Sequence, residues 1–396
     1  MNSKERVRAA YQHKEPDRVP VGEMHIMSPV ASEILGREAV TGEGGWLKYT
    51  KMRMLREGRR AEFMERLCKD TLDVFRGSGL DLVTTELDPP SEDPVAYEDV
   101  GEKGWKEVDK ETGLWARFAY VPENDTVHEV GCSAKEGEGY EAIRLELDAL
   151  EKSLARPLDD AMFESTRYMA DHAGGEMFLM AKAPDLIPSY RSWYPKFMEI
   201  LHLDPELAHR VCDLYLARAK RVAARYIEIG VDCVMIASDW ASANGPIFSP
   251  AHIREYLIPQ MESICALCHE RGVFVLKHTD GNIMQFADDF FAMPIDGYQS
   301  VDPGAGMDIA LVKRRWGGKV LLMGNVDCAR TLPYGTKEDV ARETRGVIAK
   351  ASAGGGHILS SSNTIGYPTR AANFLTMVET AHEAGAYPID PERLLV

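Results

Sequence analysis

The chain has 396 residues, of which 45% are hydrophobic and 27% charged, a balance typical of a globular protein with a large core. Acidic residues outnumber lysine and arginine by 62 to 46, which gives a formal net charge of −16. Because nucleic-acid backbones are bound by clustered basic residues, this charge argues against a nucleic-acid partner.

The sequence contains no signal for a membrane or a secreted location. No apolar run is long enough to cross a bilayer, and the polar N-terminal stretch lacks the apolar core of a signal peptide. The seven cysteines are an odd number scattered over a long chain, which is not a disulfide framework. We therefore expect a cytoplasmic protein with reduced thiols and no membrane partner.

The first third of the chain mixes strand and helix signals. Residues 18–26 follow an amphipathic first helix and have the pattern of a strand, as do residues 79–87. A polar helical region lies between them, over about 46–76. Residues 95–131 alternate between apolar and polar side chains around glycine-rich turns, so we expect an inserted antiparallel hairpin there.

From residue 176 onward the pattern becomes regular. Short apolar runs that end in polar residues alternate with helical segments, and they occupy residues 177–185, 231–240, 273–282, 295–303, 319–327 and 356–363. With the two earlier strands this makes eight, and eight alternating units favour a closed (β/α)8 barrel over an open sheet. No GxGxxG turn follows the first strand, as a dinucleotide fold would require. We expect one barrel domain over residues 1–396.

In such a barrel the C-terminal ends of the strands converge on one cavity, where active sites lie. The side chains expected there are rich in carboxylates and include two imidazoles. The expected catalytic residues and metal ligands are Glu86, Asp239, His278 and Asp280. The expected substrate contacts are Glu23, His25, Trp240, Tyr298, Asn325 and Asn363.

So many acids in one cavity favour a bound cation, either a divalent metal or a cationic substrate. His278 and Asp280 point the same way from one strand, so both can reach one ion, and Glu86 is the expected third ligand from across the barrel. The alternative is that His278 only forms hydrogen bonds and Asp280 turns the chain into the loop that follows.

Asp239 and Trp240 end the fourth strand, where they face the other strand ends. A substrate-facing role is expected for both; the alternatives are that Trp240 only caps the barrel and that Asp239 only caps a loop. Asp239 and Asn325 are expected to orient the substrate, and Trp240 and Tyr298 to form apolar walls.

Six motifs resemble the uroporphyrinogen decarboxylase superfamily, which includes corrinoid-dependent methyltransferases. The resemblance is clear at the N-terminus and over the C-terminal half, and weaker from about 90 to 170. The motifs are RVRAAYQHKEPDRVPV (6–21), GVDCVMIASDWASANGPIFSPAHIREYLIP (230–259), KHTDGNI (277–283), GYQSVDPGAGMDI (297–309), LLMGNVD (321–327) and GGGHILSSSNTIGYPT (354–369).

Two departures separate the chain from known branches of that superfamily. The decarboxylases have an arginine-rich segment after the first strand, where this chain has Glu23, so porphyrinogen decarboxylation is not expected. The thiol-activating methyltransferases bind zinc through His-x-Cys and a later Cys, where this chain has His278-Thr279-Asp280 and Ser362-Asn363. An oxygen and nitrogen site formed by Glu86, His278 and Asp280 takes the place of the thiolates.

The resemblance implies a methyltransferase that moves a methyl group from a small O- or N-methylated compound to a corrinoid protein. It implies a divalent metal, zinc by family, acting as a Lewis acid. The corrinoid would be carried by a separate protein, because no Asp-x-His-x-x-Gly segment occurs here. The family also suggests a homodimer. The alternatives are a lyase that cleaves a small carboxylated or ether substrate with Asp239 or Glu86 as proton donor, and a barrel that binds a ligand without catalysis.

Overall fold

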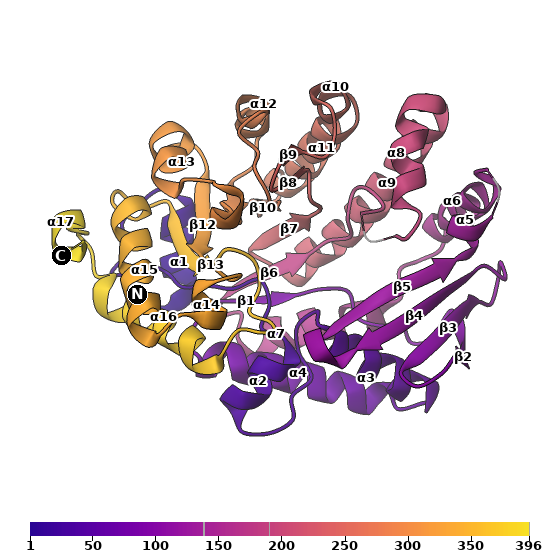
Figure 1. Cartoon of the computed structure of the whole chain (residues 1–396), viewed down its shortest axis with the longest axis horizontal. Helices are drawn as coiled ribbons and strands as arrows, with labels where there is room; N and C mark the ends of the chain where they lie inside the picture. The colour runs from indigo at the N-terminus through magenta and orange to yellow at the C-terminus, as the bar shows by residue number, and fades with distance from the viewer. Residues whose placement is uncertain (138, 190, 396) are drawn as a thin grey trace.

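The computed structural model describes residues 1–137, 139–189 and 191–395. Its centre is a parallel sheet of seven strands in the order β1-β6-β7-β10-β11-β12-β13, curled as in a TIM-type barrel (Figure 1). The strands are β1 (Leu82–Thr85), β6 (Phe178–Lys182), β7 (Cys233–Ala237), β10 (Phe274–His278), β11 (Gly297–Gln299), β12 (Leu321–Val326) and β13 (His357–Ser361). Each coincides with a strand expected from the sequence.

The sheet forms because its strands are short apolar runs that can be buried on both faces. Side chains such as Met235, Leu276 and Met323 fill the barrel interior, while their neighbours on the same strands pack outward against the helices. Because side chains alternate along a strand, His278 lies on the same face of β10 as Leu276, which is the interior face.

The first expected strand, residues 18–26, is present only as an extended segment with two isolated parallel bridges, Val21 to Leu359 and Ile26 to Ile365. The Gly22 N–H donates to the Leu359 carbonyl at 3.0 Å, and the Asp81 N–H donates to the Val21 carbonyl at 2.7 Å. The segment therefore lies between β13 and the start of β1, in the place of an eighth strand. Its ladder is interrupted, so the expectation of eight regular strands is corrected to seven strands and this segment.

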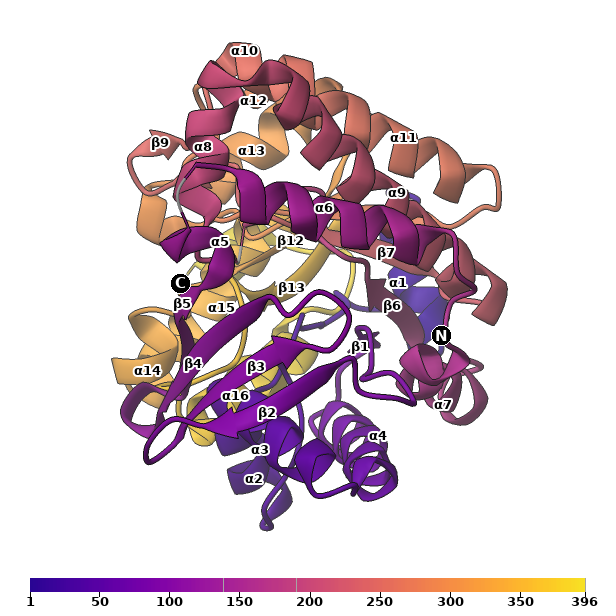
Figure 2. The same ribbon diagram turned by 90° about the vertical axis from the view of Figure 1, so that its right-hand side faces the viewer.

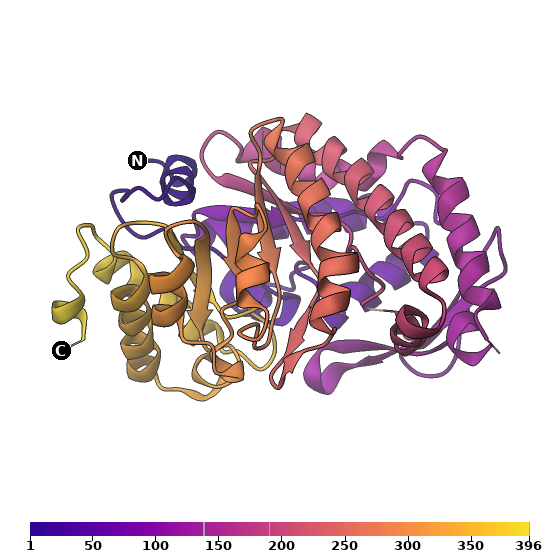
Figure 3. The ribbon, with the colours of Figure 1, turned by 90° about the horizontal axis from the view of Figure 1, so that it is seen from above.

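Helices surround the sheet, as seen from above in Figure 3, and the two chain termini lie on the same side of the molecule (Figure 1). The α-helices are α1 (Ser3–Tyr11), α2 (Ser28–Leu35), α3 (Gly45–Arg56), α4 (Arg60–Gly77), α5 (Ser133–Glu136), α6 (Glu141–Leu154), α7 (Glu164–His172), α8 (Tyr194–Leu203), α9 (Pro205–Ile229), α10 (Pro250–His252), α11 (Ile258–His269), α12 (Ala287–Ala292), α13 (Ile309–Trp316), α14 (Thr331–Tyr334), α15 (Lys337–Ala351), α16 (Ala371–Ala384) and α17 (Pro391–Leu394). Short 3₁₀ helices span Pro122–Asn124, Asp160–Phe163 and Pro303–Ala305, and a π-helix spans Ile253–Leu257. No helix within the described residues is long and apolar enough to span a membrane.

The insertion after β1 is larger than the expected hairpin. It is a four-stranded antiparallel sheet of β2 (Val95–Asp99), β3 (Gly104–Asp109), β4 (Trp115–Val121) and β5 (Thr126–Cys132), which lies beside α3 on one side and α6 on the other (Figure 2). Positive backbone φ angles at Gly101, Gly113 and Asp125 mark its three turns. A separate two-stranded ribbon, β8 (Ala241–Ser242) with β9 (Gly245–Pro246), follows β7.

Candidate active site

Asp239, His278 and Asp280 meet at the C-terminal ends of β7 and β10. These strands are neighbours in the sheet, and His278 is in register with Ala237. The His278 Nε2 atom lies 3.6 Å from Asp239 Oδ1 and 3.8 Å from Asp280 Oδ1. Asp239 Oδ1 also accepts the backbone N–H of Asp280 at 2.9 Å. Each residue offers one ligand atom, and these three atoms lie within 4.8 Å of one another.

A hydrogen bond to Gln299 sets the orientation of the His278 ring. The His278 Nδ1–H donates to Gln299 Oε1, and Gln299 Nε2 donates to the backbone carbonyl of Asn363 at 3.3 Å, which fixes the amide. With Nδ1 bonded to Gln299, Nε2 is the ring atom that faces the two carboxylates. Histidine ligands of metals are held in this way in proteins.

Asp280 has one oxygen occupied and one open. Asn363 Nδ2 donates to Asp280 Oδ2, whereas Asp280 Oδ1 is buried without a hydrogen-bond partner among the described residues. Burial raises the pKa of Asp280, and the charge of Asp239 raises it further against the opposing effect of His278. A cation beside Oδ1 would remove the cost of ionising this carboxylate, so the donor set fits a divalent metal that accepts one nitrogen and carboxylate oxygens.

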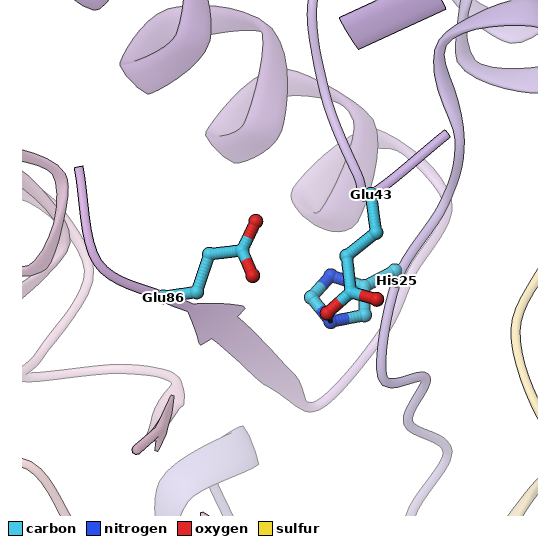
Figure 4. A group of neighbouring side chains, drawn as sticks. All are labelled: His25, Glu43 and Glu86. Carbon is cyan, nitrogen blue, oxygen red and sulfur yellow. Dashed lines mark ion pairs between the residues drawn. The ribbon is translucent and has the colours of Figure 1, made fainter. Parts of the chain in front are cut away.

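A second group is formed by His25, Glu43 and Glu86, whose side chains lie near one another (Figure 4). His25 Nε2 lies 3.0 Å from Glu43 Oε1, and Lys182 is paired with the same oxygen. Burial opposes ionisation of Glu43, but His25 and Lys182 together hold its pKa well below the ordinary value. Burial and the charge of Glu43 raise the pKa of Glu86. Glu43 is therefore the ionised member of this group, and Glu86 is the one that retains its proton more readily.

The first group and two members of the second, His25 and Glu43, line one cavity of about 250 Å3, whereas Glu86 lines a neighbouring cavity. The walls of the first cavity include His25, Glu43 and Lys182 on one side and Asp239, His278, Asp280 and Asn363 on the other. A pocket with carboxylates, imidazoles and one lysine at the C-terminal ends of barrel strands is the usual position of an active site in this fold.

The structure separates Glu86 from the two residues that it was expected to join. Glu86 follows β1, and in the sheet β6 and β7 lie between β1 and β10, so Glu86 groups with His25 and Glu43. Asp239, from the strand next to β10, is the carboxylate that lies beside His278 and Asp280. His25 and Asn363, two expected substrate contacts, line the cavity.

The other four expected substrate contacts do not line this cavity. Glu23 is fully buried and accepts hydrogen bonds from the Ser361 N–H and hydroxyl, both at 2.7 Å. Asn325 Nδ2 donates to the Val301 carbonyl at 2.7 Å. Trp240 and Tyr298 are fully buried behind the strands, where both pack edge-on against Phe290. Their positions support roles in packing and loop geometry.

Sequence reasoning missed Glu43 and Lys277. Glu43 lies in the loop between α2 and α3, away from any strand end, and the only sequence signal is the glycine-rich segment TGEGG around it. Lys277 was not expected to contribute to the site, because adjacent side chains on a strand point to opposite faces and Lys277, next to His278, lies on the outer face of β10. There its Nζ is fully buried, 4.8 Å from the centre of the Trp240 ring, and donates to the carbonyl oxygens of Ser238 at 2.5 Å and of His278.

Comparison with known families decides the classification. The model of the uroporphyrinogen decarboxylase (URO-D) family matches residues 144–384, which is more than half of the chain. The chain belongs to the URO-D family. This match covers all the strands from β6 to β13, and so includes Asp239, His278 and Asp280.

Among curated relatives, the uroporphyrinogen decarboxylase of Legionella pneumophila (strain Corby) is 24% identical over 194 residues, which is 48% of this chain and 52% of that protein. That of Chlorobium phaeovibrioides (strain DSM 265 / 1930) is 27% identical over 196 residues, with the same coverage of 48% and 52%. The chain thus spans about half the length of the curated relatives it matches.

A solved structure extends the similarity in fold to nearly the whole length of this URO-D family chain. A methyltransferase from Methanosarcina mazei superimposes with a TM-score of 0.68 over 97% of this chain and 99% of that one, at 18% sequence identity. At this identity the likeness establishes the fold, including the regions outside the family match.

Proposed function

We propose that this URO-D family protein is a methyltransferase that transfers a methyl group from a small O- or N-methylated compound to a corrinoid protein. The family and the methyltransferase of the same fold support methyl transfer in general terms. The observation that carries the proposal is the arrangement at His278, whose Nε2 atom lies 3.6 Å from Asp239 Oδ1 and 3.8 Å from Asp280 Oδ1 while Nδ1 bonds to Gln299.

We assign Asp239, His278 and Asp280 as the ligands of a divalent metal, with zinc as the expected ion because its sites combine imidazole and carboxylate. Once bound, the metal would act as a Lewis acid on the heteroatom that releases the methyl group. Gln299 keeps the proton of His278 on Nδ1, and Asn363 holds Asp280 Oδ2, so that the ligand atoms face the cavity before any ion binds.

A neighbouring carboxyl supplies the proton. In the transfer, the methyl group leaves without its bonding electrons for the cobalt of the corrinoid, and the heteroatom keeps the electron pair and takes up a proton. Glu86 is the assigned donor, because burial and the charge of Glu43 raise the pKa of its carboxyl. Glu43, ionised between His25 and Lys182, provides that charge.

The test is a methyl-transfer assay with free cob(I)alamin as the acceptor and a panel of methoxylated and N-methylated compounds as donors. We expect methylcobalamin to form with at least one donor, and His278→Ala to lower the rate at least about a hundredfold. His269→Ala, which changes a histidine paired with Asp296 away from the cavity, is the control and should keep the rate. No methylcobalamin from any donor would contradict the proposal.

A lyase is the second candidate, since the curated relatives are decarboxylases and Glu86 is placed to give a proton. The two functions are separated by the acceptor. Release of carbon dioxide from a small acid without cob(I)alamin would favour the lyase, whereas turnover that requires cob(I)alamin favours methyl transfer.

A further inference from the structure

A second cavity of about 250 Å3 adjoins the metal-site cavity and opens between the end of β6 and α9. It is lined by Glu86, Lys182, Asp185, Arg191, Tyr215 and Arg218. Lys182 lines both cavities, so a ligand in the second cavity can reach toward His278 past this side chain. No sequence expectation assigned a role to Arg218.

Arg218 lies on α9 at the border of the second cavity. Val211 and Val222 are buried on this helix, Tyr215 is half-buried against the same core, and Arg218 is exposed. Its side chain nevertheless lines the cavity together with Tyr215. Arg218 is therefore a solvent-accessible cation at the cavity.

The charge of Arg218 is not balanced by a carboxylate within the described parts of the chain. On the same helix, Arg210 lies 2.5 Å from Asp148 and 2.9 Å from Glu151. In the cavity, Arg191 is paired with Glu146 at 3.1 Å, and Lys182 with Glu43. Arg218 is thus the cation of the cavity whose guanidinium is available to an incoming anion.

The acids of the second cavity do not cancel that positive charge. Burial raises the pKa of Asp185 to about 7 against the opposing charge of Lys182, and it also raises the pKa of Glu86. Asp185 is therefore protonated to a substantial extent near neutral pH, and the shift of Glu86 has the same direction. Asp185 Oδ1 is buried without a hydrogen-bond partner among the described residues, so it is open to a polar ligand atom.

The cavity also has apolar walls and a second opening. Leu87, Ile187 and Pro188 line it beside the charged groups. A cavity of about 310 Å3 under the inserted sheet shares Arg191, Tyr215 and Arg218 with it. Arg218 stands where the two join, which places its guanidinium at the end of the path that is remote from His278.

We propose that the second cavity binds a small organic acid whose carboxylate pairs with Arg218 and whose apolar body lies against Leu87, Ile187 and Pro188. A planar guanidinium matches the two oxygens of a carboxylate, and a cavity of this size accepts a small molecule. The inference rests on the proposed function in one respect, which is that the methylated end of the acid points toward His278. The substrate class is then a methylated carboxylic acid.

The binding claim is tested with the purified chain by isothermal titration calorimetry. The probes are acetate, benzoate and phenylacetate, the neutral amide of each, and methyl phosphate, at low ionic strength and neutral pH. The variants are Arg218→Gln, Arg218→Lys and the control Arg221→Gln. Arg221 lies one turn along α9 and donates to the backbone carbonyl of Ser153 at 3.3 Å, outside the cavity.

We expect at least one acid to bind, its amide to bind at least about tenfold more weakly, and Arg218→Gln to weaken the acid about tenfold or more while Arg221→Gln leaves it unchanged. Arg218→Lys should fall between, because it keeps the charge without the planar fork. The proposal is overturned if no acid binds, if the amide binds as tightly, if Arg218→Gln binds as the wild type does, or if methyl phosphate is the tighter anion. Because the titration needs neither metal nor corrinoid, its failure is distinct from a failure of the methyl-transfer assay.

Discussion

Glu23 shows how a buried carboxyl can replace part of a strand ladder. Its side chain accepts the Ser361 N–H, which a backbone carbonyl would accept in an uninterrupted parallel sheet. Burial raises the pKa of Glu23 to about 8. At neutral pH this group is therefore protonated in the folded protein. The contact between residues 18–26 and β13, which we call the seam, loses stability when a higher pH removes the proton.

The first prediction concerns this seam. The folded pKa of Glu23 lies above its ordinary value of 4.5, so the stability linked to its proton is fully present below about pH 4.5 and is lost as the pH rises toward 8. Glu23→Gln has no proton to lose, and its amide can still bond to Ser361. Urea unfolding should show that, between pH 5 and pH 8, the variant gains about 3 kcal/mol relative to wild type. Parallel pH profiles of the two proteins would contradict this account.

Lys277 lies on the outer face of β10, behind the proposed metal ligand His278. Its buried Nζ bonds to the carbonyl oxygens of Ser238 and His278, at the ends of the two strands that carry the proposed ligands. Burial lowers the pKa of Lys277 to about 7, although Asp239 and Asp185 oppose the shift. We regard Lys277 as a positioning residue that joins these strand ends.

Lys277→Met should therefore weaken metal binding by about tenfold or more while the fold survives, since residues that orient metal ligands have effects of this size. Zinc titration monitored by calorimetry measures the change. Lys313→Met is the matched control, because Lys313 also donates to a backbone carbonyl, that of Gly355. Gly355 lies just before the N-terminal end of β13, at the opposite end of the strands from the proposed ligands. Equal zinc affinity in wild type and Lys277→Met would leave Lys277 with a packing role alone.

At the scale of elements, the inserted sheet is tied to the barrel through Asp125. This residue forms the turn between β4 and β5 with φ at 51°, and its Oδ1 accepts the Trp46 N–H at 2.6 Å in the first turn of α3. The first N–H groups of a helix lack partners within the helix, so Asp125 caps α3 from another part of the chain. The glycine at 44 is needed there, because a Cβ atom would lie 2.3 Å from Asp125 Oδ2.

We predict that Asp125→Ala lowers the free energy of unfolding by about 1 to 2 kcal/mol, because it removes the cap and places alanine at positive φ. Asp125→Asn should cost much less, since asparagine retains an acceptor oxygen and tolerates this backbone conformation. Denaturant unfolding of both variants measures the difference. Similar losses in the two variants would mean that the charge of Asp125, rather than its geometry, stabilises the junction.

These elements also show which features the sequence could and could not predict. The seven buried strands were predictable, because each is a short apolar run between helical segments. Residues 18–26 have the same pattern but lack a regular ladder, because the Glu23 side chain replaces a backbone partner. The alternation in 95–131 predicted antiparallel strands, yet the number of strands depends on three turns whose conformations composition alone does not fix.

The candidate site was predictable in part for the same physical reason. His278 and Asp280 share one strand end, so their proximity follows from the alternation along a strand. The third neighbour depends on which strands are adjacent, and the sheet order placed Asp239 there instead of Glu86. Glu43 reaches the cavity from a loop between two helices, which no periodicity reveals.

At the scale of the whole molecule, the barrel brings together three connected regions at one end. The proposed metal ligands lie at the ends of β7 and β10, His25 and Glu43 line the same cavity, and Glu86 and Arg218 line the adjoining cavity that shares Lys182. If the proposed roles are correct, this order runs from a Lewis acid to a proton donor to an anion site, and it would hold a substrate at one end and demethylate it at the other.

Metal analysis of the purified protein tests the central claim most directly. The measurement is the molar ratio of divalent metals by mass spectrometry in wild type, Asp239→Ala, Asp280→Ala and Glu86→Gln, each after equilibration with zinc and removal of unbound ion. We predict about one equivalent in the wild type and in Glu86→Gln, and a loss of most of it in the two aspartate variants. A wild type without metal, or aspartate variants that retain it while Glu86→Gln does not, would contradict the account.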